Sequence, residues 1–125
     1  TARKHHILHP NTFLKEDDKE FALRLLAESI ARYDDYFQLI SEHLDNWKSD
    51  RLVSTDATLI VMGITEAVVF PTIPVKVTIN EYIEISKLYS TPDSRRFVNG
   101  MLDRLSTVLK EEGKLKKTGL GLIEK

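Results

Sequence analysis

Three histidines near the start of the chain are the residues with the widest range of possible chemistry. His5, His6 and His9 lie close together in the sequence. A zinc site needs ligands at fixed spacing on defined elements. These histidines lie instead in a segment broken by Pro10 and Asn11, with no carboxylate at a fixed spacing. We therefore predict no metal site here.

No other set of residues predicts a catalytic centre. His43 is flanked by Glu42 and Asp45 on an expected helix, where a solvated position is favoured over acid-base chemistry. The sequence has no H-E-x-x-H motif, no glycine-rich phosphate loop and no nucleophile elbow. The absence of cysteine excludes disulfides, thiolate zinc sites, iron–sulfur clusters and thiol nucleophiles. We expect a protein that is not an enzyme and that holds no cofactor.

Length and composition predict one ordinary globular domain. A chain of 125 residues with 42% hydrophobic residues can bury most of the surface that its unfolded form exposes. Its net charge of -1 provides no general attraction for nucleic acid, so such binding would need a local patch. The longest nearly apolar run, residues 57–70, is shorter than the roughly 20 residues of a bilayer span. We expect a cytoplasmic protein with no membrane partner.

The clearest periodic signal lies in the first half of the chain. Residues 1–16 lack a sustained period and are predicted to be an arm or linker. From Asp17 onward, apolar residues recur at alternating steps of four and three, which predicts one long helix or two helices with a break near Asp34 and Asp35. The apolar stripe comprises Ala22, Leu26, Ile30, Tyr33, Phe37, Ile40, Leu44 and Trp47.

A second helix is expected from Ser54 to Phe70. Its start combines a capping residue with early negative charge at Asp56. The segment is apolar on nearly all sides, which predicts a central helix wrapped by the others. A buried strand is the alternative, because several residues are β-branched, but the length favours a helix. Pro71 and Pro74 then end the element.

Two more helices are expected in the second half of the chain. Thr78 and Glu81 have the spacing of a capping box, which predicts that the third helix starts at Thr78. The fourth helix is expected to have Thr91 or Asp93 as its cap and Pro92 in its first turn.

Two residues inside the fourth helix are assigned structural roles. Gly costs about 1 kcal/mol relative to Ala within a helix, so Gly100 is expected to mark a close approach between helices. Asn99 is expected to be buried and hydrogen-bonded.

The four helices predict an all-α bundle with a single core over residues 17–112. Residues 113–125 form a tail that contains Lys and Gly. Its apolar residues Leu120, Leu122 and Ile123 are available to dock on the bundle, although no local signal requires this.

Residues 74–104 closely resemble the NusB family. Members carry a V-x-I-N/D-E-A-I-E-x-A-K phrase followed by a D/N-S-x-K-F-V-N-G-x-L-D phrase. This chain matches both, with Tyr82 and Ser86 where alanine is usual and Arg96 in place of lysine. The resemblance covers about residues 17–109. It implies a compact NusB-like helical bundle that acts in transcription antitermination or termination.

The resemblance also implies partners. These are boxA-type single-stranded RNA and the ribosomal protein NusE, with indirect contact to other Nus factors and RNA polymerase. Recognition of single-stranded RNA uses aromatic stacking and hydrogen bonds to base edges, beside cations that neutralise phosphates. By their positions in the family motif, the RNA-binding candidates are Tyr89, Asp93, Arg95, Arg96 and Phe97.

Each candidate has a structural alternative. Phe97 lies on the apolar stripe of its helix, and Tyr89 could pack on the core. Asp93 would stabilise the first helical turn without any RNA. Arg95 and Arg96 could be ordinary solvated charges.

One family feature has no counterpart near the start of this sequence. An arginine-rich helix near the family's amino terminus supplies much of the boxA contact, and nothing in residues 1–11 resembles it. With neither an initiating Met nor a signal-peptide core, the chain is expected to be a fragment or to have altered first helices. Two alternatives follow: a NusB-like RNA-binding fragment of a ribosomal RNA cytosine methyltransferase, or a protein-interaction bundle without RNA binding.

Overall fold

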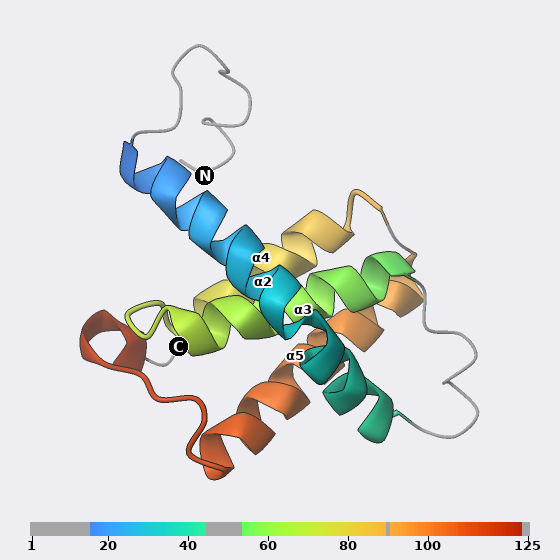
Figure 1. The fold of residues 1–125 in the computed structure, drawn as a ribbon. Helices are drawn as coiled ribbons and strands as arrows, with labels where there is room; N and C mark the ends of the chain where they lie inside the picture. The colour runs from blue at the N-terminus through green and yellow to red at the C-terminus, as the bar shows by residue number, and fades with distance from the viewer. Residues whose placement is uncertain (1–15, 45–53, 90, 124–125) are drawn as a thin grey trace.

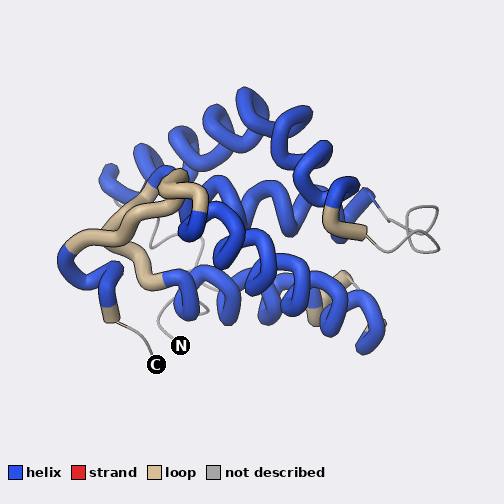
Figure 2. Tube along the Cα trace, turned by 90° about the horizontal axis from the view of Figure 1, so that it is seen from below, coloured by secondary structure: helices blue, strands red, loops and turns tan. Residues whose placement is uncertain are grey.

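The computed structural model describes residues 16–44, 54–89 and 91–123 as a bundle of helices (Figure 1). Within these ranges there is no strand, and the expected all-α fold class is confirmed (Figure 2). The elements are α2 (Glu16–Glu42), α3 (Ser54–Val69), α4 (Val75–Ser86), α5 (Pro92–Glu111) and a 3-10 turn, η3 (Gly119–Leu122).

The long helix α2 is continuous, so the break considered near Asp34 does not occur. It crosses α3, its main packing partner (Figure 1). The apolar stripe predicted for α2 is wrong in its amino-terminal half, because Leu26 is 52% exposed and Ile30 is 69% exposed. Leu25 and Ser29 are buried in their place. Periodicity finds the apolar face of a helix, but the packing partner decides which residues are covered. Trp47, the last residue of the stripe, lies outside the described residues.

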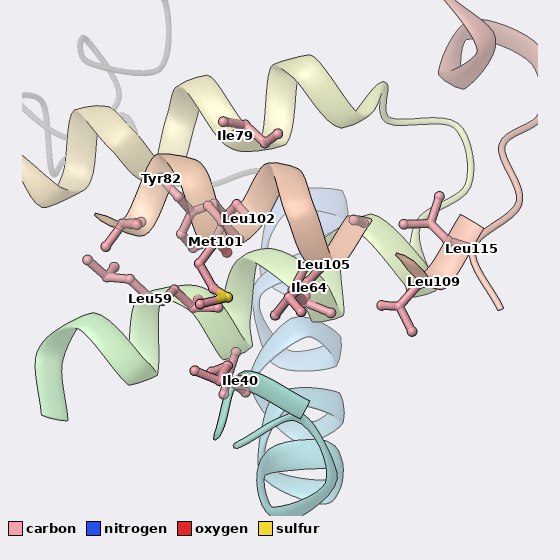
Figure 3. Close-up of a cluster of buried hydrophobic side chains, with 14 residues drawn as sticks. Ile40, Leu59, Ile64, Ile79, Tyr82, Met101, Leu102, Leu105, Leu109 and Leu115 are labelled. Atoms are coloured by element: carbon pink, nitrogen blue, oxygen red, sulfur yellow. The ribbon is translucent and has the colours of Figure 1, made fainter. Parts of the chain in front are cut away.

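Helix α3 is the central element, as expected, and the strand alternative is wrong. Ile60, Val61 and Ile64 have no exposed surface, and Thr65 satisfies its buried hydroxyl by donating to the carbonyl of Val61 at 2.7 Å. Figure 3 shows the side chains of α3, α4 and α5 meeting in this core. The residues packed there include Ile40, Leu59, Ile64, Ile79, Tyr82, Met101, Leu102, Leu105, Leu109 and Leu115.

The close approach between helices occurs at Gly63 and not at Gly100. A Cβ atom on Gly63 would lie 2.7 Å from Cδ2 of Leu102, on α5. Gly100 is exposed and has nothing within 4 Å of such an atom, and Asn99 is exposed as well. The expectations for Asn99 and Gly100 are therefore wrong, because both residues lie on the outer face of α5.

Alanine substitutions at these two glycines should have opposite effects. Gly63→Ala should destabilise the fold by up to about 2 kcal/mol, since overpacking against the fully buried Leu102 costs about 1–3 kcal/mol and the gain in helix propensity returns about 1 kcal/mol. Gly100→Ala should stabilise it by up to about 1 kcal/mol through helix propensity alone. Urea unfolding of the two variants measures both changes. Equal effects would contradict the assignment of the close approach to Gly63.

Helix α4 begins one turn earlier than expected, at Val75, with Pro74 as its N-cap. The capping box predicted for Thr78 and Glu81 is therefore wrong. Thr78 already lies inside the helix, where its backbone N–H donates to the carbonyl of Pro74 at 3.2 Å. Its hydroxyl donates to Oε2 of Glu66 at 2.6 Å, and both side chains are buried. Thr78 thus joins α4 to α3.

The start of α5 follows the expectation closely. Thr91 is the N-cap, and its hydroxyl accepts from the backbone N–H of Ser94 at 3.2 Å. Pro92 occupies the first turn, where its missing N–H costs nothing. The cap is Thr91, one of the two residues proposed for that position.

The segment after α5 packs on the bundle, but through residues other than those expected. Gly113 turns the chain with φ of 74°, and Leu115 then enters the core with 2% of its surface exposed. Leu120, Leu122 and Ile123 stay exposed.

Three contacts fasten the same segment to the connection between α3 and α4. The Nζ of Lys117 donates to the carbonyls of Ala67 at 2.7 Å and Phe70 at 3.1 Å. The backbone N–H of Thr118 donates to the carbonyl of Pro71 at 3.1 Å. Gly121 lies so close to that carbonyl that a Cβ atom would collide with it.

Candidate nucleic-acid interface

The candidate residues lie around the junction between α4 and α5. Tyr89 follows α4 and is 68% exposed, so it is not part of the core. Asp93 and Arg96 lie one turn apart on α5 and form an exposed ion pair. Arg95 is half-buried, and Phe97 is partly buried against the core. Tyr89, Asp93 and Arg96 are thus exposed to a ligand, whereas much of Phe97 is committed to packing.

Asp56 is a further charged residue beside this junction. It lies in the first turn of α3, is 5% exposed, and is linked by a side-chain hydrogen bond to Ser94 in the first turn of α5. Burial raises the pKa of the Asp56 carboxyl, and the hydrogen bond with Ser94 opposes that change. The sequence identified Asp56 only as a favourable charge at a helix start. Its contact with α5 is non-local and has no sequence signal.

The raised pKa of Asp56 predicts a pH-dependent stability difference. A carboxyl that holds its proton more tightly in the folded state stabilises the fold most at low pH. That contribution is lost as the pH rises above the ordinary value of 3.8 and through the raised pKa. Asp56→Asn cannot ionise, so its unfolding free energy should increase relative to the original chain between about pH 3 and pH 7. Urea unfolding at several pH values tests this, and a difference that declines with pH would contradict it.

The described residues contain no group of three or more His, Asp or Glu side chains able to hold a metal ion. His5, His6 and His9 lie outside those residues. His43 is half-buried, and its Nδ1 lies 2.9 Å from the carbonyl of Leu39, one turn earlier. Among the helices that the structure describes, none combines the length and apolarity needed to cross a membrane. The described part of the chain is a small all-α domain with an exposed aromatic and charged junction.

Comparison with known proteins identifies the family of this domain. The model of the NusB family matches residues 3–107, and the chain belongs to that family. The resemblance noted in residues 74–104 is thereby confirmed.

Two relatives are proteins named transcription antitermination protein NusB. The protein from Salinibacter ruber is 41% identical over 105 residues, which cover 84% of this chain and 66% of the relative. The protein from Chloroherpeton thalassium is 39% identical over 106 residues, which cover 85% of this chain and 50% of the relative. The chain thus spans between half and two thirds of the length of these relatives.

A solved structure, T. maritima NusB, has a similar fold. It superposes with a TM-score of 0.69 at 35% sequence identity, covering 81% of this chain and 72% of the other. The relatives are transcription antitermination proteins, a class that was predicted from the motifs in residues 74–104 in preference to an enzyme.

Proposed function

We propose that this chain acts in transcription antitermination in the cytoplasm by holding boxA-type single-stranded RNA at the junction between α4 and α5. NusE would bind an adjacent face, and other Nus factors and RNA polymerase would be reached indirectly. The exposed ring of Tyr89 is the observation that carries the proposal. A helical bundle gains little stability from an aromatic ring left 68% in solvent, whereas an unpaired base can stack on it.

The charges near Tyr89 support the same assignment. Arg95 and Arg96 supply positive charge for the RNA backbone, and Asp93 offers an acceptor for a base edge. In the unbound protein Arg96 pairs with Asp93, so RNA would have to compete for one or both partners. The pair is exposed, and exposed pairs contribute at most about 1 kcal/mol, so this competition costs little. The names of the relatives favour antitermination over the methyltransferase alternative.

Salt dependence separates backbone contacts from ordinary surface charge. With a boxA-like RNA followed by fluorescence anisotropy, the double variant Arg95→Ala, Arg96→Ala should reduce the slope of log K against log salt by roughly 0.7 per lost phosphate contact. Lys19→Ala on α2, also exposed, is the matched control and should leave the slope unchanged. An unchanged slope in the double variant would show that neither arginine contacts an RNA phosphate and that both are ordinary solvated charges.

The proposal as a whole is tested by titrating the folded chain with boxA-like RNA in the presence and absence of NusE. Saturable binding that exceeds binding to a scrambled RNA is expected, and it should strengthen when NusE is present. A folded, helix-rich sample without RNA affinity in either condition would reject RNA binding for this chain. It would leave the protein-interaction bundle as the better description.

A further inference from the structure

A groove of about 710 Å³ lies at the end of the bundle away from the α4–α5 junction. Its walls are the first turns of α4, the second half of α5 and the segment after Gly113. In Figure 1 that last segment, coloured red, returns from the end of α5 towards the loop between α3 and α4. From Ile79, the last residue of α4 that lines the groove, about 10 Å of helix remain before α4 ends at Ser86, beside the junction proposed for RNA. We call this groove the C-terminal groove.

The lining of the C-terminal groove combines aliphatic surface with positive charge. Its apolar residues are Val75, Ile79, Leu115, Leu122 and Ile123. Its charged residues are four lysines, Lys76, Lys110, Lys116 and Lys117, and one acid, Asp103.

The lysines of the groove differ in what they offer a ligand. Lys117 is committed to the carbonyls of Ala67 and Phe70, and burial lowers the pKa of its ammonium group. Lys76 and Lys116 are exposed and lie on walls contributed by different elements. The groove therefore presents cationic side chains on two of its sides.

The C-terminal groove exists before any ligand arrives. The wall formed by the segment after Gly113 is fixed against the end of α3 and the loop after it. The contacts that fix it are made by Lys117, Thr118 and Gly121. A partner would not have to order this segment in order to bind. Preorganisation of this kind reduces the entropic cost of association.

We infer that the C-terminal groove is a docking site for an acidic amphipathic segment of a protein partner. Aliphatic side chains of that segment would cover Leu122 and Ile123, which are 66% and 47% exposed, and its carboxylates would face Lys76 and Lys116. Charge complementarity selects the acidic character of the partner. No aromatic residue lines the groove as described, so it lacks the stacking surfaces that single-stranded RNA uses. The proposal is independent of RNA binding at the junction.

The test uses the whole 125-residue chain and a synthetic peptide probe. The peptide is helical, with Leu at positions i, i+3, i+4 and i+7 and Glu on its remaining face, and its control carries Gln in place of Glu. Saturable binding of the Glu peptide is expected, with amide chemical shifts changing at Lys76, Ile79, Thr107, Lys116 and Leu122. The Gln peptide should bind roughly tenfold more weakly at low salt, with the difference shrinking as salt increases.

Matched variants locate the binding site. Leu122→Ala should weaken the Glu peptide by roughly five- to tenfold, whereas Leu120→Ala, in the same turn but outside the groove, should not. The double variant Lys76→Glu, Lys116→Glu should weaken it by roughly tenfold or more, and Lys19→Glu, Lys87→Glu should not. All these side chains are exposed, so loss of the fold is not expected to mimic loss of binding.

Three outcomes would overturn the proposal. Equal binding of the Glu and Gln peptides would remove the electrostatic argument. Larger shifts of the groove amides with single-stranded RNA than with the peptide would identify a nucleic-acid site. Shifts of the same amides with protein concentration alone would identify an interface between two copies of this chain.

Discussion

Replacing Tyr89 with Ala is expected to weaken binding of boxA-like RNA by about 5- to 150-fold. Stacking of one base on an aromatic side chain contributes about 1–3 kcal/mol, and each 1.4 kcal/mol corresponds to about a tenfold change in affinity. Because Tyr89 is 68% exposed, its ring adds little to folding, and the unfolding midpoint in urea should barely change. Tyr89→Phe keeps the stacking face and should bind within about twofold of the original chain.

The neighbouring Leu88 provides the matched control for this experiment. It is 76% exposed at the same end of α4 but has no aromatic ring, so Leu88→Ala should leave RNA affinity unchanged. Fluorescence anisotropy at one fixed salt concentration measures the RNA affinity of the original chain and of the three variants, Tyr89→Ala, Tyr89→Phe and Leu88→Ala. Equal losses of RNA affinity from Tyr89→Ala and Leu88→Ala would show that RNA contacts the end of α4 without a specific need for an aromatic ring. Stacking on Tyr89 would then be rejected.

Thr78→Val should have the largest effect on stability among the single substitutions considered. The side chains of Thr78 and Glu66 are 1% and 2% exposed, and the Thr78 hydroxyl donates to the Glu66 carboxylate at 2.6 Å. Valine keeps the shape of threonine but removes the donor, leaving a buried carboxylate with one hydrogen bond fewer. A hydrogen bond to a charged group contributes about 1.5–3 kcal/mol, and a loss of that size is expected.

Urea unfolding measures the loss of unfolding free energy in Thr78→Val and in the control variant Thr107→Val. Thr107 is also helical and donates its hydroxyl to the carbonyl of Asp103, but it is exposed, so its replacement should cost no more than about 0.5 kcal/mol. Adding Glu66→Met to Thr78→Val should recover little of the lost stability, because the Glu66 carboxylate also interacts with the part-buried ammonium group of Lys117, which would lose that partner. Similar losses in the two Thr→Val variants would contradict the role assigned to the buried hydrogen bond.

The sequence was sufficient to predict those elements whose signals are local. The cap at Thr91 and the proline after it lie within one turn of the helix that they start, and both are observed. The apolar character of α3 on all sides likewise predicted its central place. The contact of Asp93 with Arg96 is local as well, since residues three apart on a helix are neighbours, but it was not predicted.

The errors arose where a distant part of the chain decides the structure. Gly63 is needed because Leu102 approaches it from another helix, and no pattern around Gly63 records that neighbour. The capping-box motif at Thr78 is present, but the helix begins one turn earlier, with Pro74 as its N-cap. The Thr78 hydroxyl donates instead to the carboxylate of Glu66. The link between Asp56 and Ser94, which joins two helix starts beside the candidate interface, is non-local in the same way.

The bond from Lys117 to Ala67 also bears on the order in which the chain can fold during synthesis. The two residues are 50 positions apart, and the donor comes second. At 5–20 residues per second, a ribosome needs about 3–10 s to make the intervening chain. A helix forms in about a microsecond. Until Lys117 is made, the end of α3 is held by its packing on α2, α4 and α5, without the ammonium group that later binds the carbonyls of Ala67 and Phe70.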